Sequence, residues 1–150
     1  MQLGVGTGCI TRELLRRLHP DARLIALEVN AVFVDECRDI RDDRLVLRHD
    51  CAGSLSDLLD ELGVEEIDAV VSSLPLAIMP NALVDRIITA SKARLAADGK
   101  FLQYQYSLSN LATLERRFPD VRLGFTLRNL PPAFVYECSQ QPSVRRASTA

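Results

Sequence analysis

The feature that most constrains this chain is a glycine-dense turn close to its amino terminus. The stretch from Leu3 to Gly8 reads LGVGTG, and a helical pattern follows at once, with Leu14, Leu15 and Leu18 at helical spacing. Glycines in such a turn allow positive φ and let a ligand approach the backbone without a Cβ in the way. The stretch predicts a strand, a tight turn and a helix whose amino terminus binds a nucleotide-like or carboxylate-bearing small molecule.

The glycine spacing differs from the dinucleotide-binding fingerprint G-x-G-x-x-G. The third glycine comes one residue early, so the run reads G-x-G-x-G and Cys9 stands at the usual place of the third glycine. This run resembles the glycine loop of the Rossmann-like methyltransferases that use S-adenosylmethionine. The resemblance implies that Gly4, Gly6, Thr7 and Gly8 bind the methionine part of this cofactor. A tight strand-to-helix turn without a ligand is the alternative.

The hydrophobic pattern then alternates between helices and strands. Helices are expected over Cys9–Leu18, from Asn30 onward, over Ser54–Leu62, from Pro80 to about Ala96, and in part of Leu111–Phe118. Further strands are expected over Ala22–Leu27, Arg44–Arg48, Ile67–Ser72, Lys100–Tyr106, Val121–Leu127 and Ala133–Cys138. This alternation predicts a parallel sheet, and two closing strands with a short link predict an antiparallel hairpin. We therefore expect an α/β fold with a doubly wound, mostly parallel seven-stranded sheet that ends in an antiparallel hairpin.

Length and composition indicate a single domain. A chain of 150 residues with 47% hydrophobic and 25% charged residues can bury one core. We assign this domain to residues 1–139 and expect residues 140–150 to form a polar tail. Few residues precede the glycine turn, whereas the corresponding strand of a doubly wound sheet is central and long, so we expect a truncated first strand.

Charge and cysteine content exclude several classes of protein. A net charge of −2 and an isoelectric point near 5.7 do not favour nucleic-acid binding, which normally needs a basic excess. No apolar run has the length of a membrane span, and no signal peptide is recognisable. The 4 cysteines lack C-x-x-C spacing and the 2 histidines are isolated, so we expect neither disulfides nor a metal site. These features favour a cytoplasmic protein.

Polar residues end successive strands, where doubly wound sheets bind their ligands. A carboxylate at Glu28 can accept hydrogen bonds from both ribose hydroxyls of a nucleoside, although an exposed strand-end Glu is the alternative. Asp50 can meet the exocyclic amine of an adenine, or it can cap a helix. Ser72 ends the next strand and is a further candidate for cofactor binding.

The segment Ser73-Leu74-Pro75-Leu76 follows that strand, at the place where this class of methyltransferase puts residues that face the transferred methyl group. It resembles the Asn-Leu-Pro-Tyr loops of amino-methylating enzymes, whose backbone carbonyls accept hydrogen bonds from the target amine. The resemblance implies catalytic roles for Ser73 and Leu74. Ser73 replaces the amide and Leu76 the aromatic, which argues against a nucleobase stacked on a ring. A rigid apolar turn before a helix is the alternative.

Longer segments make the resemblance more specific. They are Ala26–Asn30, Ala69–Leu76, Phe101–Tyr106 and Arg128–Ala133. Together with the glycine loop they resemble the bacterial phospholipid N-methyltransferases, which convert phosphatidylethanolamine to phosphatidylcholine with S-adenosylmethionine. The resemblance covers about Leu3 to Cys138. Gln2 departs from it, because an acidic side chain is usual there, and the family's amphipathic membrane-binding segment is expected upstream of the first strand.

The resemblance also implies how the acceptor amine is held. Methyl transfer from a sulfonium to an amine is an in-line displacement, so the protein mainly positions and desolvates the reactants. Burial of the amine beside Leu74, Leu76 and Ile78 is expected to lower its pKa and keep it neutral. Tyr106 is expected to hold the methylated ammonium by a cation–π interaction and to count among the catalytic residues. A tyrosine of the core is the alternative.

Two further residues are candidates for substrate binding. Tyr104 lies on the same side of the expected strand as Tyr106, because the two tyrosines alternate with Gln103 and Gln105. Arg128 can meet the lipid phosphate, although a solvated arginine is the alternative. The leading hypothesis is a peripheral membrane enzyme that methylates phosphatidylethanolamine. An RNA adenine N6-dimethyltransferase and a truncated, catalytically silent cofactor-binding fold remain as alternatives.

Overall fold

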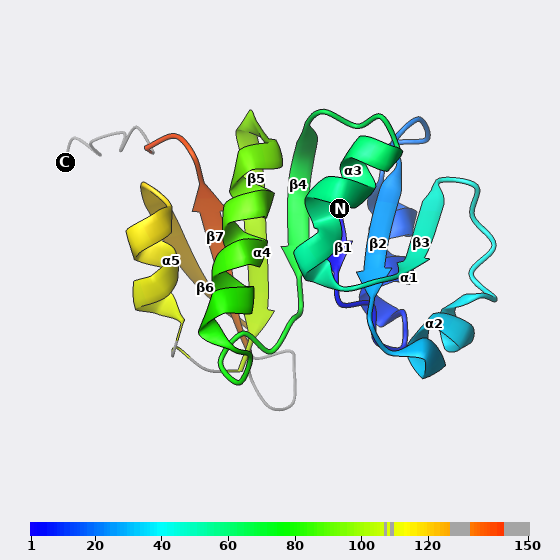
Figure 1. Cartoon of the computed structure of the whole chain (residues 1–150), viewed down its shortest axis with the longest axis horizontal. Helices are drawn as coiled ribbons and strands as arrows, with labels where there is room; N and C mark the ends of the chain where they lie inside the picture. The colour runs from blue at the N-terminus through cyan, green and yellow to red at the C-terminus, as the bar shows by residue number, and fades with distance from the viewer. Residues whose placement is uncertain (107, 109, 127–132, 143–150) are drawn as a thin grey trace.

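Seven strands form one sheet in the order β3-β2-β1-β4-β5-β7-β6 (Figure 1). This computed structural model describes residues 1–106, 108, 110–126 and 133–142. The strands are β1 (Gln2–Leu3), β2 (Leu24–Glu28), β3 (Leu45–His49), β4 (Ile67–Ser72), β5 (Leu95–Gln105), β6 (Asp120–Thr126) and β7 (Ala133–Ser139). The strands β1 to β5 pair in parallel, and β7 is antiparallel to both β5 and β6. The predicted sheet and its terminal hairpin are confirmed.

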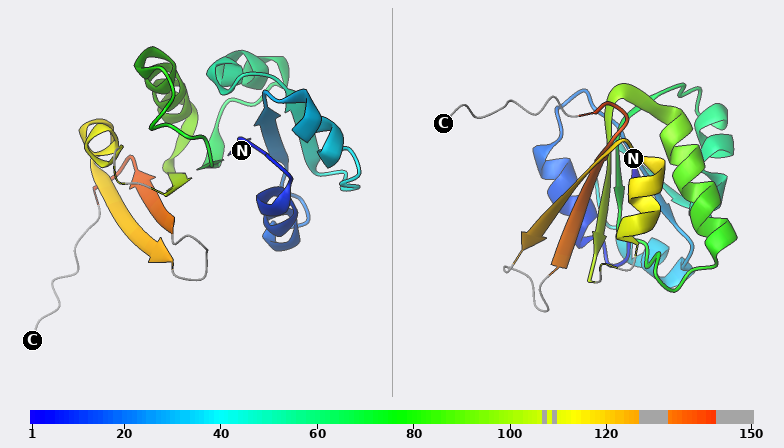
Figure 2. Two further views of the ribbon diagram at one scale, coloured as in Figure 1. Left: turned by 90° about the horizontal axis from the view of Figure 1, so that it is seen from below. Right: turned by 90° about the vertical axis from the view of Figure 1, so that its left-hand side faces the viewer.

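Helices cover both faces of this sheet. They are α1 (Cys9–Arg17), α2 (Ala31–Cys37), the 3-10 turn η1 (Ala52–Ser54), α3 (Leu55–Glu61), α4 (Asn81–Arg94) and α5 (Leu111–Arg117). α1 lies on one face, and α3, α4 and α5 lie on the other (Figure 2). Asn30 caps α2 as predicted, because its side-chain oxygen accepts a hydrogen bond from the N–H of Val32. Among the described residues, no helix has the length and apolar character needed to cross a membrane.

The main core lies between the sheet and the helices α3, α4 and α5. Leu3, Val70 and Phe101 of the sheet are completely buried, as are Leu59 of α3 and Ile87 of α4. Burying a side chain of this size contributes roughly 1.5–3 kcal/mol to folding. This apolar layer holds the carboxyl ends of the central strands in register, and the loops that follow them are therefore placed on a rigid base.

The predicted start of β5 is wrong. We expected the strand to begin at Lys100, after a turn at Asp98, but it already begins at Leu95. Along β4 the pairing moves from Ile67 to Ala69, while along β5 it moves from Leu95 to Lys100. The additional residues of β5 form an irregularity of the bulge type, which a turn-like sequence can mimic.

The strand β1 is short, so the first residues of its neighbours β2 and β4 have no strand between them and flank a hollow. β1 pairs with β2 and β4 only through Gln2 and Leu3. The hollow has a volume of about 390 Å³, and Met1, Leu24 and Ile67 are among the residues that line it. The amine of Met1 donates a hydrogen bond to the carbonyl of Ala69 at 2.7 Å. Burial lowers the pKa of this amine from 8.0 to about 6, against the smaller raising effect of Asp68.

This buried amine predicts a pH-dependent stability. Between pH 6 and 8.0 the unfolded chain binds a proton at Met1 that the folded chain does not, so the free energy of unfolding should rise with pH across this window. The full effect of such a lowering of the pKa is about 3 kcal/mol, of which about 2 kcal/mol develops within this window. Urea denaturation at both ends of the window measures it.

Two altered chains serve as controls for this prediction. An Nα-acetylated chain has no titrating amine and should lose this part of the pH dependence. A short run of β-branched residues added before Met1 should also remove it and raise the melting temperature by filling the hollow, whereas a Gly-Ser run should not raise it. A pH dependence that acetylation leaves unchanged would refute the assignment to Met1.

Candidate functional site

The loop between β1 and α1 is built from three glycines with positive φ. These angles are 78° at Gly4, 55° at Gly6 and 80° at Gly8. A Cβ at Gly4 would lie 3.2 Å from the Leu74 side chain, and one at Gly8 would lie 2.8 Å from Cys37 Sγ. A Cβ at Gly6 would have no protein atom within 4 Å. Gly4 and Gly8 therefore permit close packing within the protein, whereas Gly6 borders open space.

The buried carboxylate of Glu28 fixes this loop to the end of β2. Its Oε2 accepts hydrogen bonds from the N–H groups of Val5 and Gly6, each at 2.9 Å. Its Oε1 accepts one from the N–H of Asn30 at 2.8 Å. Burial opposes ionisation of this carboxyl, but these hydrogen bonds outweigh it and lower its pKa. The alternative of an exposed glutamate is wrong, since Glu28 is 7% exposed.

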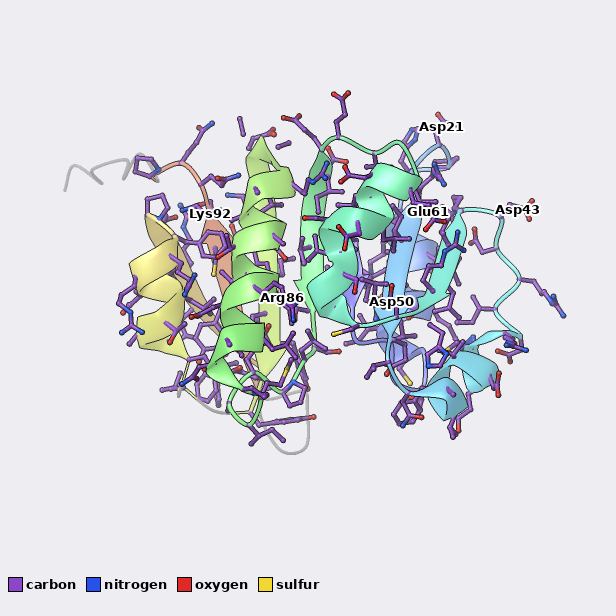
Figure 3. All side chains as sticks on the ribbon, viewed as in Figure 1. Asp21, Asp43, Asp50, Glu61, Arg86 and Lys92 are labelled. Atoms are coloured by element: carbon purple, nitrogen blue, oxygen red, sulfur yellow. The ribbon has the colours of Figure 1, made fainter. Side chains whose placement is uncertain are left out.

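A cavity of about 370 Å³ lies beside the loop, at the carboxyl ends of β1, β2, β3 and β4. The residues that line it include Gly4, Gly6, Leu27, Glu28, Val29, Phe33, Asp50, Leu74, Met79 and Leu83. This is the point where the strand order reverses, at which doubly wound sheets bind their ligands. Asp50 follows β3 here (Figure 3), and its Oδ1 also accepts a hydrogen bond from the N–H of Cys51 at 2.6 Å. Asp50 therefore lies at the cavity, and the alternative of a helix cap is wrong, because Cys51 caps η1 through a hydrogen bond that its Sγ accepts from the N–H of Gly53.

The chemistry of the first cavity fits S-adenosylmethionine. Gly6 offers backbone in a place that a Cβ would fill. The carboxylates of Glu28 and Asp50 supply acceptors for hydroxyls and for an amine, since a carboxylate offers about four acceptor sites. Leu27 and Phe33 add apolar surface for a ring.

Two predicted cofactor residues of the loop do not line this cavity. Gly8 is buried and begins α1, while Thr7 is exposed and its hydroxyl lies 3.4 Å from Cys9 Sγ. Ser72 is also absent from the cavity wall, because it is completely buried and its Oγ accepts a hydrogen bond from the N–H of Leu74 at 3.4 Å. Thr7, Gly8 and Ser72 lie in or next to the turns that border the cavity, and their contact with the cofactor stays a prediction.

A second cavity of about 420 Å³ adjoins the first. It is lined by Ser73, Leu74, Pro75, Ala77, Ile78, Tyr104, Gln105 and Tyr106. Ser73, Leu74 and Pro75 line both cavities and therefore form a shared wall. The Oγ of Ser73 donates a hydrogen bond to the carbonyl of Gly4 at 2.9 Å, which ties this wall to the glycine loop.

Tyr104 and Tyr106 form an aromatic pair beside the second cavity. Their ring centroids are 5.5 Å apart with an interplanar angle of 76°, and the Tyr104 hydroxyl donates to the Tyr106 hydroxyl at 3.1 Å. Burial, with a smaller effect of the Tyr106 hydroxyl, raises the pKa of Tyr104 to about 12, so the phenol stays neutral. The structure thus brings four predicted residues together, namely Ser73, Leu74, Tyr104 and Tyr106.

One predicted contact is wrong, and another falls outside the described residues. Leu76 was expected beside the acceptor amine, but it is 2% exposed and belongs to the main core. The chain reverses between Pro75 and Pro80, so Leu76 points inward while Ile78 is 84% exposed and lines the second cavity. Arg128 lies outside the described residues.

Two buried glutamines support the site. The sequence interpretation missed Gln103 and named Gln2 only as a departure from the family resemblance. The Nε2 of Gln103 donates hydrogen bonds to the carbonyls of Leu74 at 2.9 Å and Tyr104 at 3.0 Å, so it fixes the shared wall from the buried side. Its Oε1 is buried and has no hydrogen-bond partner among the described residues. The amide of Gln2 donates to the carbonyl of Gly4 at 3.1 Å and accepts from the hydroxyl of Thr11 at 2.8 Å. The only sequence signal for Gln103 was the Gln-Tyr-Gln-Tyr alternation, which does not say whether the glutamines or the tyrosines face the core.

Gly6 predicts a specific loss of cofactor binding. The change Gly6→Ala places a Cβ in the first cavity, so we expect the dissociation constant for S-adenosylmethionine to rise at least tenfold, which corresponds to about 1.4 kcal/mol. Titration calorimetry measures it.

Gly63 offers a matched control for this change. It also has a positive φ, of 65°, and a Cβ there would likewise have no protein atom within 4 Å, but Gly63 follows α3 and does not line the cavity. Gly63→Ala should therefore cost similar stability and leave cofactor binding unchanged. Equal binding by both variants would contradict the placement of the cofactor beside Gly6.

Comparison with known sequences identifies close relatives of two kinds. No family model matches the chain. It is 37% identical over 142 residues to an ornithine lipid N-methyltransferase of Singulisphaera acidiphila, a match that covers 92% of this chain and 73% of that protein. It is 31% identical over 72 residues to a ribosomal RNA small subunit methyltransferase H of Ralstonia pickettii, which covers 48% of this chain but only 23% of that protein.

Solved structures show the same fold. The N-methyltransferase NodS from Bradyrhizobium japonicum superposes with a TM-score of 0.74 at 13% identity, over 95% of this chain and 84% of that chain. Human methyltransferase-like protein 13 in complex with SAH superposes with a TM-score of 0.73 at 16% identity, over 98% of this chain and 73% of that chain. Two further solved structures of this fold are also complexes with SAH. The chain belongs to the lipid N-methyltransferase family of its Singulisphaera relative and has the fold of the solved methyltransferases.

Proposed function

We propose that this methyltransferase acts on the amine of phosphatidylethanolamine and converts this lipid toward phosphatidylcholine at a membrane surface. The observation that carries the proposal is the wall Ser73–Leu74–Pro75, which separates a cofactor cavity from an apolar second cavity of suitable size for a headgroup. The ornithine lipid N-methyltransferase relative supports a lipid amine as the acceptor, and it makes an ornithine lipid the second candidate substrate.

The first cavity holds the methyl donor. Gly6 would allow close backbone approach, Glu28 would accept hydrogen bonds from the ribose hydroxyls, and Asp50 would meet the adenine amine, since all three residues line this cavity. S-adenosylmethionine, when bound, supplies a methyl group on a sulfonium sulfur. The chain contributes position and the exclusion of water, because a bond from nitrogen to the methyl carbon forms as the carbon–sulfur bond breaks in line with it.

The second cavity prepares the acceptor amine. No acidic or basic side chain is among the described residues that line it, so no general base is at hand. Its apolar surface, including Leu74 and Ile78, disfavours the ammonium form and lowers the pKa of the amine. The Leu74 carbonyl accepts hydrogen bonds from the Nε2 of Gln103 at 2.9 Å and from the N–H of Leu76 at 2.8 Å. Both of its lone pairs are therefore used to fix the shared wall against which the amine is placed.

The aromatic pair of Tyr104 and Tyr106 binds the methylated product. Each methyl group replaces one N–H, and the fully methylated ammonium carries a charge with no proton left to donate, so an aromatic ring is its suitable partner. Tyr106 borders the cavity with an exposed ring, and Tyr104 supports it edge to face. Arg128 remains the proposed contact for the lipid phosphate.

Two alternatives compete with this proposal. An RNA adenine N6-dimethyltransferase shares the fold, and a ribosomal RNA methyltransferase is among the relatives, but that match spans less than half of this chain. Leu76 replaces the stacking aromatic and lies in the core, which disfavours a flipped base. A catalytically silent fold would bind the cofactor but transfer no methyl group.

Transfer of labelled methyl groups tests the proposal directly. The purified chain is given labelled S-adenosylmethionine with detergent-dispersed phosphatidylethanolamine, ornithine lipid or ribosomal RNA. We expect label in phosphatidylethanolamine and none in RNA. Label in ornithine lipid alone would replace the substrate, label in RNA alone would refute a lipid acceptor, and cofactor binding without transfer would indicate the silent fold.

Tyr106 predicts a graded effect on turnover. Tyr106→Leu removes the ring and should lower kcat/KM about twofold to thirtyfold, which corresponds to the roughly 0.5–2 kcal/mol of a cation–π contact. Tyr106→Phe keeps the ring and should retain most activity. Cofactor affinity should not change in either variant, because Tyr106 does not line the first cavity. Equal losses in both variants would assign the effect to the hydroxyl instead.

A further inference from the structure

Exposed apolar side chains gather at the carboxyl ends of the parallel strands, which we call the cavity edge of the sheet. Seven large hydrophobic side chains are exposed among the described residues, namely Val29, Val32, Ile78, Tyr106, Leu108, Leu123 and Phe125. Val29, Ile78 and Tyr106 line the two cavities, and Leu108 and Phe125 lie where β5 and β6 end. We define Ile78, Tyr106, Leu108 and Phe125 as the apolar rim, with exposed fractions of 84%, 56%, 46% and 56%.

The register of the strands places these residues at a common level. Tyr106 and Leu108 follow β5, and Ile78 belongs to the loop after β4. Phe125 pairs with Phe134, which in turn pairs with Gln105 at the end of β5. The end of β6 therefore lies at the same edge as the loop after β4. Ile78 and Tyr106 also line the second cavity, so this cavity opens within the rim.

Charge is distributed unequally between the two edges of the sheet. Among the described residues of the loops that lead from strand ends to the next helix, Asp50 is the single charged one. The opposite edge carries exposed charges at Asp21, Arg23, Glu65 and Glu66, of which Asp21 is labelled in Figure 3. The charged helix α2 lies far from β5 along the sheet (Figure 1), so the described part of the rim is apolar and uncharged.

We propose that the apolar rim inserts into a lipid bilayer, so that the second cavity opens directly onto the headgroup layer. This inference rests on the proposed function, because a lipid whose acyl chains stay in the membrane can present its amine only to a cavity at the membrane surface. The four described rim residues are exposed, apolar and uncharged, which suits insertion among uncharged or zwitterionic lipids. A basic patch attracted to anionic lipids would require a cluster of Lys or Arg in its place.

A fluorescence test is possible because the chain contains no tryptophan. Leu108→Trp introduces a single reporter in the rim, and Leu123→Trp introduces one at a matched site that is 45% exposed but lies away from the edge. With phosphatidylcholine vesicles, which offer no methyl acceptor, we expect a blue shift of the Leu108→Trp emission and none for Leu123→Trp. Shifts of equal size, or none at Leu108→Trp, would overturn the proposal.

Vesicle sedimentation gives a second and independent measurement. The double variant Leu108→Ser, Phe125→Ser should bind phosphatidylcholine vesicles at least tenfold more weakly than the parent chain, while Leu123→Ser should bind as the parent does. Equal melting temperatures of the two variants would establish that the comparison is between folded proteins. Binding that needs anionic lipid and disappears at high salt, or capture of a protein partner by the rim without vesicle binding, would refute bilayer insertion.

The outcomes separate this inference from the proposed function. Rim-dependent vesicle binding without transfer of methyl groups to any lipid would support the apolar rim as a membrane-docking surface and refute the lipid as methyl acceptor. Methyl transfer to detergent-dispersed lipid without vesicle binding would keep the acceptor and reject the docking surface.

Discussion

The buried carboxylate of Glu28 is the interaction on which the site depends. A glycine loop with three positive φ angles has little intrinsic rigidity, and glycine loses more conformational freedom on folding than other residues. The hydrogen bonds that Glu28 accepts from Val5, Gly6 and Asn30 fix the loop to β2 and to the start of α2. One ionised side chain thus sets the shape of the first cavity and remains available at its wall.

A second set of polar contacts joins this loop to the acceptor side. Ser73 bonds to the Gly4 carbonyl, and Gln103 bonds to the Leu74 carbonyl from within the core. Gln2 bonds to the Gly4 carbonyl from the opposite face of the sheet. Because buried polar groups are costly unless paired, such contacts specify one arrangement of the loops. The two cavities are therefore positioned by the same few backbone carbonyls.

Much of this fold was predictable from the sequence, because hydrophobic periodicity and glycine spacing report directly on strands, helices and the switch point. The bounds of β4 were predicted residue for residue. The start of β5 was not, since Asp98 and Gly99 form a turn-like signal inside a paired strand. Leu76 and Gln103 exposed a different limit: which side of a loop or strand faces the core depends on tertiary packing, and alternation alone leaves it open.

The wall between the cavities is only one loop thick, and this has a consequence for how such an enzyme can change. Leu74 lines both cavities, so the volume of its side chain affects the size of each. A smaller residue there would widen the donor side and the acceptor side together, and a larger one would narrow both. Selectivity toward donor and acceptor is thereby coupled at a single position, and divergence toward a bulkier headgroup has to proceed through the outer lining at Ile78 or Tyr106 instead.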